Sequence, residues 1–267
     1  MEVIIRPNAQ DAADLTARVI AADLRARPEL VLGLATGRTM ESVYANLVRL
    51  HRDEQLDFSR CRTFNLDEYV GLPADHPNSY RHYMNNQLFS KVNIDPANTH
   101  LPDGTAADLE VECKKYEWYI VQCGGIGLQL LGIGRDGHMG FNEPLSAFRS
   151  RTRLKALSPV TRAENASQFP RPEDVPHRAI TMGVATILDS RRAVLLATGA
   201  DKAEIVAQAV EGPMTSMISA SALQLHPRCI VVLDEAAAGG LKQMEFYRWI
   251  FESEPEWAEF RSAKPSP

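Results

Sequence analysis

The stretch Leu130-Leu131-Gly132-Ile133-Gly134-Arg135-Asp136-Gly137-His138-Met139-Gly140-Phe141-Asn142-Glu143-Pro144 decides how the fold of this chain is interpreted. It begins in a short apolar run, 128–133, that is typical of a buried strand. Two glycines interrupt the run, and Asp136-Gly137-His138 follows, with a second carboxylate at Glu143. In parallel α/β sheets, ligands collect at the carboxyl ends of strands, where such loops begin. The stretch therefore predicts acid–base chemistry on a loop that follows a parallel strand.

Apolar runs and helical spacing alternate along the rest of the chain. Further strands are predicted at 1–6, 30–35, 62–66, 193–198 and 229–233. Amphipathic spacing predicts helices at 8–27, 41–51, 77–92, 106–123, 203–211, 218–225 and 241–252. No linker or internal repeat divides the sequence. We therefore expect one α/β domain over 1–267, with a mostly parallel sheet covered by helices on both faces.

Composition excludes several classes of protein. The net charge is −5, from 29 basic and 34 acidic residues, which argues against a general nucleic-acid binder. The sequence has no apolar run long enough to span a membrane and no segment resembling a signal peptide. Its four cysteines show no CxxC pairing, and Cys61 and Cys229 lie in apolar runs that favour buried, reduced thiols. We expect a cytoplasmic protein without membrane contact.

Polar residues also follow three other predicted strands. Thr36-Gly37-Arg38-Thr39 stands between a strand and a helix, where backbone N–H groups can bind an anion, although a simple turn fits equally well. Asp67 follows the strand at 62–66. Lys202 opens the helix at 203–211, either as a structural cap or as a phosphate ligand. Because the net charge is negative, an anionic substrate would depend on such local groups.

These strand ends together suggest a reaction class. An anion clamp, a carboxylate base at Asp67 and His138 supported by Asp136 and Glu143 suit proton abstraction beside a carbonyl in a phosphorylated sugar. A metal site on His138 and the carboxylates is less favoured, because no second histidine or cysteine stands at a suitable spacing. The sequence has neither a GxGxxG nor a GxxxxGK[ST] motif. The residues alone therefore favour acid–base chemistry over a metal site, and a nucleotide site is less favoured still.

The segment 158–178 differs in character from its surroundings. It contains four prolines and few large apolar residues. Long polar excursions inside compact domains are usually functional lids or disordered insertions. We predict an active-site lid, because the segment follows the acid–base loop closely.

The chain resembles the glucosamine-6-phosphate deaminase family over nearly its whole length. The matching motifs include Asp67-Glu68-Tyr69-Val70-Gly71-Leu72, and Asp136-Gly137-His138 running into Phe141-Asn142-Glu143-Pro144. The related 6-phosphogluconolactonases share a similar GxGxDGH segment, but Phe141-Asn142-Glu143-Pro144 points to the deaminases. The resemblance implies a Rossmann-like fold and conversion of glucosamine 6-phosphate and water to fructose 6-phosphate and ammonia, without a metal or an organic cofactor.

The resemblance also implies a role for each site residue. Asp67 would move a proton between C2 and C1, and His138 would open the sugar ring with Asp136 and Glu143 completing its relay. The phosphate would lie among Thr36, Gly37, Thr39 and Lys202. In the lid, Gln168 stands where the family commonly has an arginine on the phosphate. We expect Arg38, or Arg171 from the lid, to supply that charge instead.

Regulation and substrate choice leave alternatives open. Allosteric members bind N-acetylglucosamine 6-phosphate between subunits near the position of Arg153, and here Ser146 and Lys155 would be remnants of that site. We predict weak or absent activation. The resemblance covers both monomers and homo-oligomers. Galactosamine 6-phosphate is an alternative substrate, a lactone hydrolase is an alternative reaction, and a sugar-phosphate sensor is a non-enzymatic alternative.

Overall fold

The computed structural model describes residues 1–261, and its larger sheet has seven parallel strands in the order β1-β10-β9-β6-β2-β3-β5. They are β1 (Glu2–Arg6), β2 (Val31–Leu34), β3 (Arg62–Asn65), β5 (Thr99–His100), β6 (Leu128–Leu131), β9 (Ala193–Ala197) and β10 (Cys229–Asp234). Every residue of β2, β6, β9 and β10 is buried, as expected for strands covered on both faces. The predicted mostly parallel α/β sheet is confirmed.

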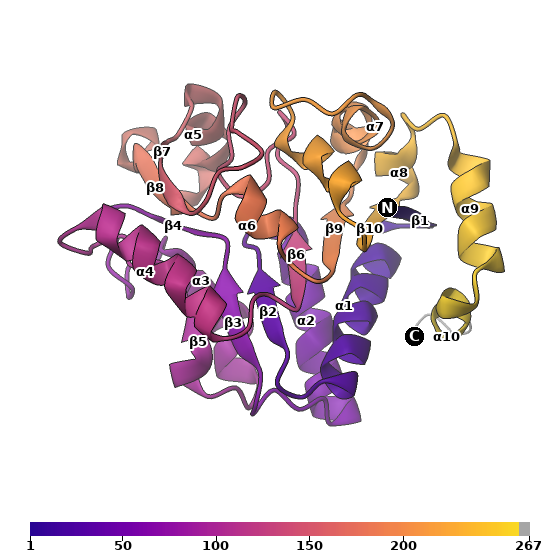
Figure 1. Ribbon diagram of the computed structural model, residues 1–267, viewed down its shortest axis with the longest axis horizontal. Coiled ribbons are helices and arrows are strands. Elements are labelled where there is room, and N and C mark those ends of the chain that lie inside the picture. Colours follow the sequence, from indigo (N-terminus) through magenta and orange to yellow (C-terminus); the bar gives the residue numbers. More distant parts are fainter. Residues whose placement is uncertain (262–267) are drawn as a thin grey trace.

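The helices cover both faces of this sheet (Figure 1). The connections β1–β2 and β2–β3 run toward one edge, so right-handed crossovers place α1 and α2 on the same face. The connections β5–β6, β6–β9 and β9–β10 run back toward the other edge, which places α4, α6 and α7 on the opposite face. These helices are α1 (Ala9–Ala26), α2 (Arg38–Glu54), α4 (Leu109–Gln122), α6 (Val184–Leu188) and α7 (Ala203–Glu211).

The remaining helices are short or peripheral. They are α3 (Tyr80–Gln87), α5 (Pro159–Asn165), α8 (Glu235–Ala238), α9 (Met244–Ser253) and α10 (Ala258–Arg261). The predicted helix at 77–92 is shorter than expected, because its α-helical part ends at Gln87 and a 3₁₀ turn follows at Phe89–Lys91. The segment Ser219–Leu225 is helical as predicted, but in the tighter 3₁₀ form.

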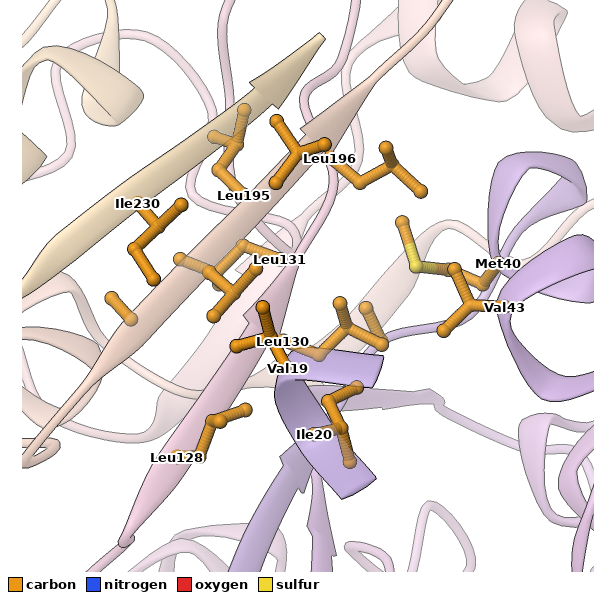
Figure 2. Close-up of a cluster of buried hydrophobic side chains, with 14 of the residues drawn as sticks. Val19, Ile20, Met40, Val43, Leu128, Leu130, Leu131, Leu195, Leu196 and Ile230 are labelled. Atoms are coloured by element: carbon orange, nitrogen blue, oxygen red, sulfur yellow. The ribbon is translucent and has the colours of Figure 1, made fainter. Parts of the chain in front are cut away.

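The main core lies between the sheet and the helices. Figure 2 shows side chains of α1 and α2 directed toward leucines of β6 and β9; the labelled residues include Val19, Ile20, Met40, Val43, Leu130 and Leu196. Each fully buried aliphatic side chain of this kind contributes about 1.5–3 kcal/mol. This packing fixes the strands, and thereby the positions of the loops that follow their carboxyl ends.

A second sheet lies beyond the carboxyl ends of the large one, beside α5 (Figure 1). It contains three antiparallel strands in the order β4-β8-β7, with the bounds β4 (Asp67–Tyr69), β7 (Arg153–Ala156) and β8 (Arg178–Thr181). This sheet was not predicted from the sequence. Its strands are three or four residues long and β7 is only partly buried, so they carry no clear alternation of apolar and polar side chains.

The predicted lid segment, 158–178, has regular structure. It contains α5 and two 3₁₀ turns, Ala166–Gln168 and Pro172–Asp174, and Ser158 caps α5 by accepting a hydrogen bond from the backbone of Thr161. Phe169 and Val175 are buried in a small apolar cluster with Tyr69 of β4. The segment is therefore anchored to the small sheet rather than extended into solvent.

Within residues 1–261, no helix is both long enough and apolar enough to cross a bilayer.

Candidate active site

A cavity of about 1270 Å³ opens at the carboxyl edge of the large sheet. The loops after β2, β6 and β9, the start of β4 and the segment 158–178 all contribute to its wall. The predicted site residues that line it are Thr36, Gly37, Arg38, Thr39, Asp67, Asp136, His138, Gln168 and Lys202. Ligand pockets usually measure about 300–1,000 Å³. The cavity is therefore large for one sugar phosphate.

The loop after β6 requires glycine at two positions. A side chain at Gly134 would collide with the imidazole of His138, whose ring atoms would lie 2.4–2.6 Å from the added Cβ. Gly137 has φ +83°, a conformation that favours glycine, and an added Cβ would meet Ile218 at 2.5 Å. The turn is closed by the Gly134 N–H, which donates to the His138 carbonyl at 2.9 Å. The Gly-Arg-Asp-Gly-His spacing thus holds the imidazole in one place.

His138 is paired with Asp136. Its Nδ1 lies 2.5 Å from Oδ1 of Asp136, which also accepts a hydrogen bond from the His138 backbone N–H at 3.1 Å. Burial by itself would lower the pKa of His138, but the neighbouring carboxylates of Asp136 and Glu143 outweigh it and raise the pKa above its usual value. Burial opposes ionisation of Asp136 too, yet the hydrogen bond and charge of His138 lower its pKa. The pair favours a charged imidazolium.

Glu143 approaches the same imidazole from the far end of the loop. It is buried, and its Oε1 accepts a hydrogen bond from the backbone N–H of Ser158 at 3.1 Å. Its Oε2 is buried and accepts no hydrogen bond from residues 1–261. Ligand atoms of Asp136, His138 and Glu143 all lie within 4.8 Å of one another. The three predicted relay residues are therefore adjacent.

The same three residues could also coordinate a cation. Two carboxylates and an imidazole suit a divalent metal. A cation bound to Nδ1 would, however, have to displace the close contact between His138 and Asp136. The arrangement fits a proton relay without displacing any existing contact.

Asp67 follows β3, as predicted. It also begins a strand that was not predicted, β4, where it pairs with Thr181 of β8. The carboxyl is buried, and burial, reinforced by the charge of Glu68, raises its pKa to about 8, while His138 opposes the shift. A carboxyl with a pKa near neutral pH can both take and return a proton. Asp67 has the properties of a general base.

Glu68 connects Asp67 to α3. It is buried and accepts hydrogen bonds from the backbone N–H groups of Tyr69, Tyr80 and Arg81, at 2.8–2.9 Å. A carboxylate is stabilised at a helix N-terminus, where N–H groups lack partners. Glu68 thereby fixes α3, which carries two tyrosines into the cavity wall.

The predicted anion loop forms the amino terminus of α2. Gly37 is its N-cap, with φ +118°, and no side chain caps the helix. Tyr83 of α3 donates a hydrogen bond from its hydroxyl to the Gly37 carbonyl at 2.8 Å. Free N–H groups and the helix dipole favour a bound anion at such an end. Tyr80 and Tyr83 were not predicted as site residues, because in the sequence they are only two aromatics in a helix.

Lys202 and Gln168 also line the cavity. Lys202 is half-buried, and burial lowers its pKa, against the charge of Asp201. Gln168 reaches the cavity from the 3₁₀ turn Ala166–Gln168. Arg171, by contrast, is not brought into the cavity. Its exposed guanidinium donates to Asp174 at 2.6 and 3.0 Å, and its contact with the phosphate stays a prediction.

The three predicted allosteric positions lie outside the cavity. Arg153 of β7 donates hydrogen bonds to Oγ of Ser146 at 3.0 Å and to Oδ1 of Asn142 at 2.8 Å. Lys155 stands two residues along β7 and is partly exposed. Arg153 thus holds the end of the acid–base loop through hydrogen bonds within the same chain.

The fold and this site are those of an α/β enzyme that acts on a sugar phosphate. The chain belongs to the glucosamine-6-phosphate isomerase/6-phosphogluconolactonase family, whose model matches residues 7–231. A glucosamine-6-phosphate deaminase of Arthrobacter sp. (strain FB24) is 49% identical over 257 residues, which cover 96% of this chain and 99% of that protein. One of Streptomyces coelicolor is 48% identical and covers the same shares.

Solved structures separate the two branches of the family. A monomeric glucosamine-6-phosphate deaminase is similar with a TM-score of 0.88 and 44% identity, over 90% of this chain and 100% of that one. A 6-phosphogluconolactonase from Trypanosoma cruzi has a TM-score of 0.73 at 19% identity, over 90% of this chain and 97% of that one. The second likeness shows a shared fold alone.

Proposed function

We propose that the chain is a glucosamine-6-phosphate deaminase, which converts glucosamine 6-phosphate and water to fructose 6-phosphate and ammonia. The observation that carries the proposal is the presence in one cavity of buried Asp67 and of His138 paired with Asp136. The 49% identity to a deaminase over almost the whole chain supports the same reaction.

His138 would act first, on the closed sugar ring. When the C1–O5 bond breaks, the C1 hydroxyl loses a proton and O5 gains one, so a single imidazole can take the first and deliver the second. The contact with Asp136 orients the ring and stabilises the imidazolium that forms in between. Glu143, whose Oε2 accepts no hydrogen bond from the described residues, would stabilise the same imidazolium. These roles account for the two carboxylates, Asp136 and Glu143, that lie beside His138.

Asp67 would act on the open chain. Its carboxylate removes the C2 proton, which gives an enolamine, and returns a proton to C1, which gives the C2 imine of the ketose. Water then hydrolyses this imine to fructose 6-phosphate and ammonia. A pKa of about 8 places the group near the pH at which transfer in both directions is efficient. Positioned proton transfer contributes on the order of 10² to 10⁴ in rate.

The phosphate would bind at the amino terminus of α2. Thr36, Gly37 and Thr39 present the loop, while Arg38 and Lys202 supply charge, and Gln168 offers a neutral amide from the lid. Arg38 is exposed, so its contact is screened, and Arg38→Ala should raise KM by about five- to tenfold with little change in kcat. An unchanged KM removes Arg38 from the phosphate site.

Regulation by N-acetylglucosamine 6-phosphate would be weak or absent. Arg153 is engaged with Ser146 and Asn142 in the isolated chain, and a solved relative is described as monomeric. We expect hyperbolic glucosamine 6-phosphate kinetics that the effector does not alter. Sigmoidal kinetics made hyperbolic by the effector contradict this part of the proposal. We also propose a cytoplasmic location, because the four cysteines are free thiols.

The decisive experiment is an ammonia assay on glucosamine 6-phosphate and galactosamine 6-phosphate, which differ at C4. Ammonia from the gluco substrate supports the proposal, and a strong preference for the galacto substrate replaces it with the close alternative. A lactonase assay on 6-phosphogluconolactone runs in parallel. Acid release from the lactone without ammonia from either amino sugar overturns the deaminase assignment.

A further inference from the structure

The geometry points to a phosphate-binding role for Arg135, the residue between Gly134 and the Asp136–His138 pair. This inference rests on the proposed function, because it concerns the phosphate of the same substrate. Arg135 lines the cavity and its side chain is 65% exposed. It belongs to the acid–base loop rather than to the anion loop at α2.

The charges around the cavity show why a further cation matters. Besides His138, three cationic side chains line the wall, namely Arg38, Arg135 and Lys202. The carboxylates that line it are Glu41, Asp67, Asp136, Glu164 and Asp201. A phosphate dianion entering this cavity meets more carboxylates than fixed cations, even with Asp67 protonated. Its binding therefore depends on every cation that can turn toward it.

Arg135 is loosely held between two of those carboxylates. Its Nε lies 3.7 Å from Oε1 of Glu164 in lid helix α5 and 3.9 Å from Oδ2 of Asp201, beyond hydrogen-bonding distance in both cases. Within residues 1–261, its guanidinium makes no hydrogen bond. A planar guanidinium with uncommitted donors suits bidentate binding of a phosphate.

The carboxylates of Glu164 and Asp201 lie beside the Arg135 guanidinium, where a bound phosphate would lie. Glu164 Oε1 is buried and accepts no hydrogen bond from the described residues, so its negative charge is poorly satisfied in the empty cavity. Asp201 and Lys202 are adjacent in the turn Ala200–Lys202, which brings Arg135 and Lys202 to the same side of the cavity. A phosphate that reaches Lys202 would exchange places with the carboxylates around Arg135. Glu164 therefore competes with the phosphate for this cation.

A structural alternative makes a different prediction. If Arg135 only latches the lid through Glu164, then removing either residue weakens the closed site in the same way. If Arg135 binds phosphate and Glu164 competes, the two substitutions act in opposite directions. The variants Arg135→Ala and Glu164→Gln separate these cases.

The readouts are the Kd of inorganic phosphate, by calorimetry on the full chain, and the KM and kcat of ammonia release. Arg135→Ala should weaken phosphate binding and raise KM about tenfold, the lower end of the range for charge-assisted hydrogen bonds because the side chain is exposed, with kcat within about threefold. Glu164→Gln should tighten phosphate binding by about two- to fivefold. Arg52→Ala, an arginine of α2 that is 72% exposed and paired with Asp53 outside the cavity, is the matched control and should match wild type.

Two results overturn the inference. One is a phosphate Kd that Arg135→Ala leaves unchanged, and the other is weaker phosphate binding in Glu164→Gln as well as in Arg135→Ala. The calorimetric readout needs no turnover. Absence of ammonia release by the wild type would thus count against the proposed function alone, while the phosphate Kd values would still decide the role of Arg135.

Discussion

Replacing Asp67 by asparagine should abolish most activity and at the same time stabilise the fold. The pKa of this carboxyl is about 8 in the folded chain, against the ordinary value of 3.8 that applies in the unfolded chain. The folded state therefore holds a proton that the unfolded chain releases, and the stability that this provides is complete below pH 3.8 and is lost progressively as pH rises toward 8. Linkage between these two pKa values gives a loss of about 2 kcal/mol at pH 5, about 4 at pH 7 and about 6 at pH 9.

Asparagine carries no charge to be buried, so it avoids this loss. We expect the unfolding free energy of Asp67→Asn to exceed that of wild type by an amount that grows by up to about 4 kcal/mol between pH 5 and pH 9. Urea denaturation at pH 5, 7 and 9 measures the difference. Ammonia release should fall by on the order of 10² to 10⁴.

The matched control is Asp75→Asn, in an exposed loop where no burial opposes the charge. Its stability relative to wild type should not grow with pH. A difference between wild type and Asp67→Asn that is the same at all three pH values would refute the reasoning, because it would mean that Asp67 ionises in the folded chain as readily as in the unfolded one.

Three further predictions follow from the site geometry. The value of kcat/KM should rise as pH rises toward about 8, because the free enzyme must ionise Asp67; a pH profile of ammonia release measures this, and a flat profile between pH 6 and 8 contradicts it. Tyr83→Phe removes the hydrogen bond to the Gly37 carbonyl and should raise KM about fivefold with kcat nearly constant, whereas an equal fall in kcat would assign Tyr83 to the chemistry instead. Dialysis against EDTA should leave activity unchanged, because His138 already contacts Asp136; a loss that a divalent cation restores would show a metal site there.

Much of the site follows from local sequence. The glycines around Asp136 and His138 permit one tight turn, and that turn brings the imidazole against its carboxylate within three residues. The Thr36–Thr39 loop joins a buried strand to a helix, so its position at an anion-binding terminus is also a local property. Parallel strands then bring these loops to one edge without further information.

Other features depend on contacts between distant parts of the chain. The small sheet forms only when Asp67–Tyr69 pairs with Arg178–Thr181, more than a hundred residues later, and short strands give no warning of such pairing. Arg171 was predicted as a phosphate ligand from its place in segment 158–178, whereas the structure pairs its guanidinium with Asp174 outside the cavity. The position of segment 158–178 beside the cavity could be predicted, but the direction of each of its side chains could not.

By itself, the sequence determined the parallel sheet, the strand-end loops and the pairing of His138 with Asp136, because periodicity and close spacing act over a few residues. Only the tertiary structure decided the environment of Asp67, since its pKa of about 8 comes from burial beneath segments remote in sequence. It also decided that Arg135 meets Glu164 and Asp201, because three segments that are separate in sequence must fold before those charges come together.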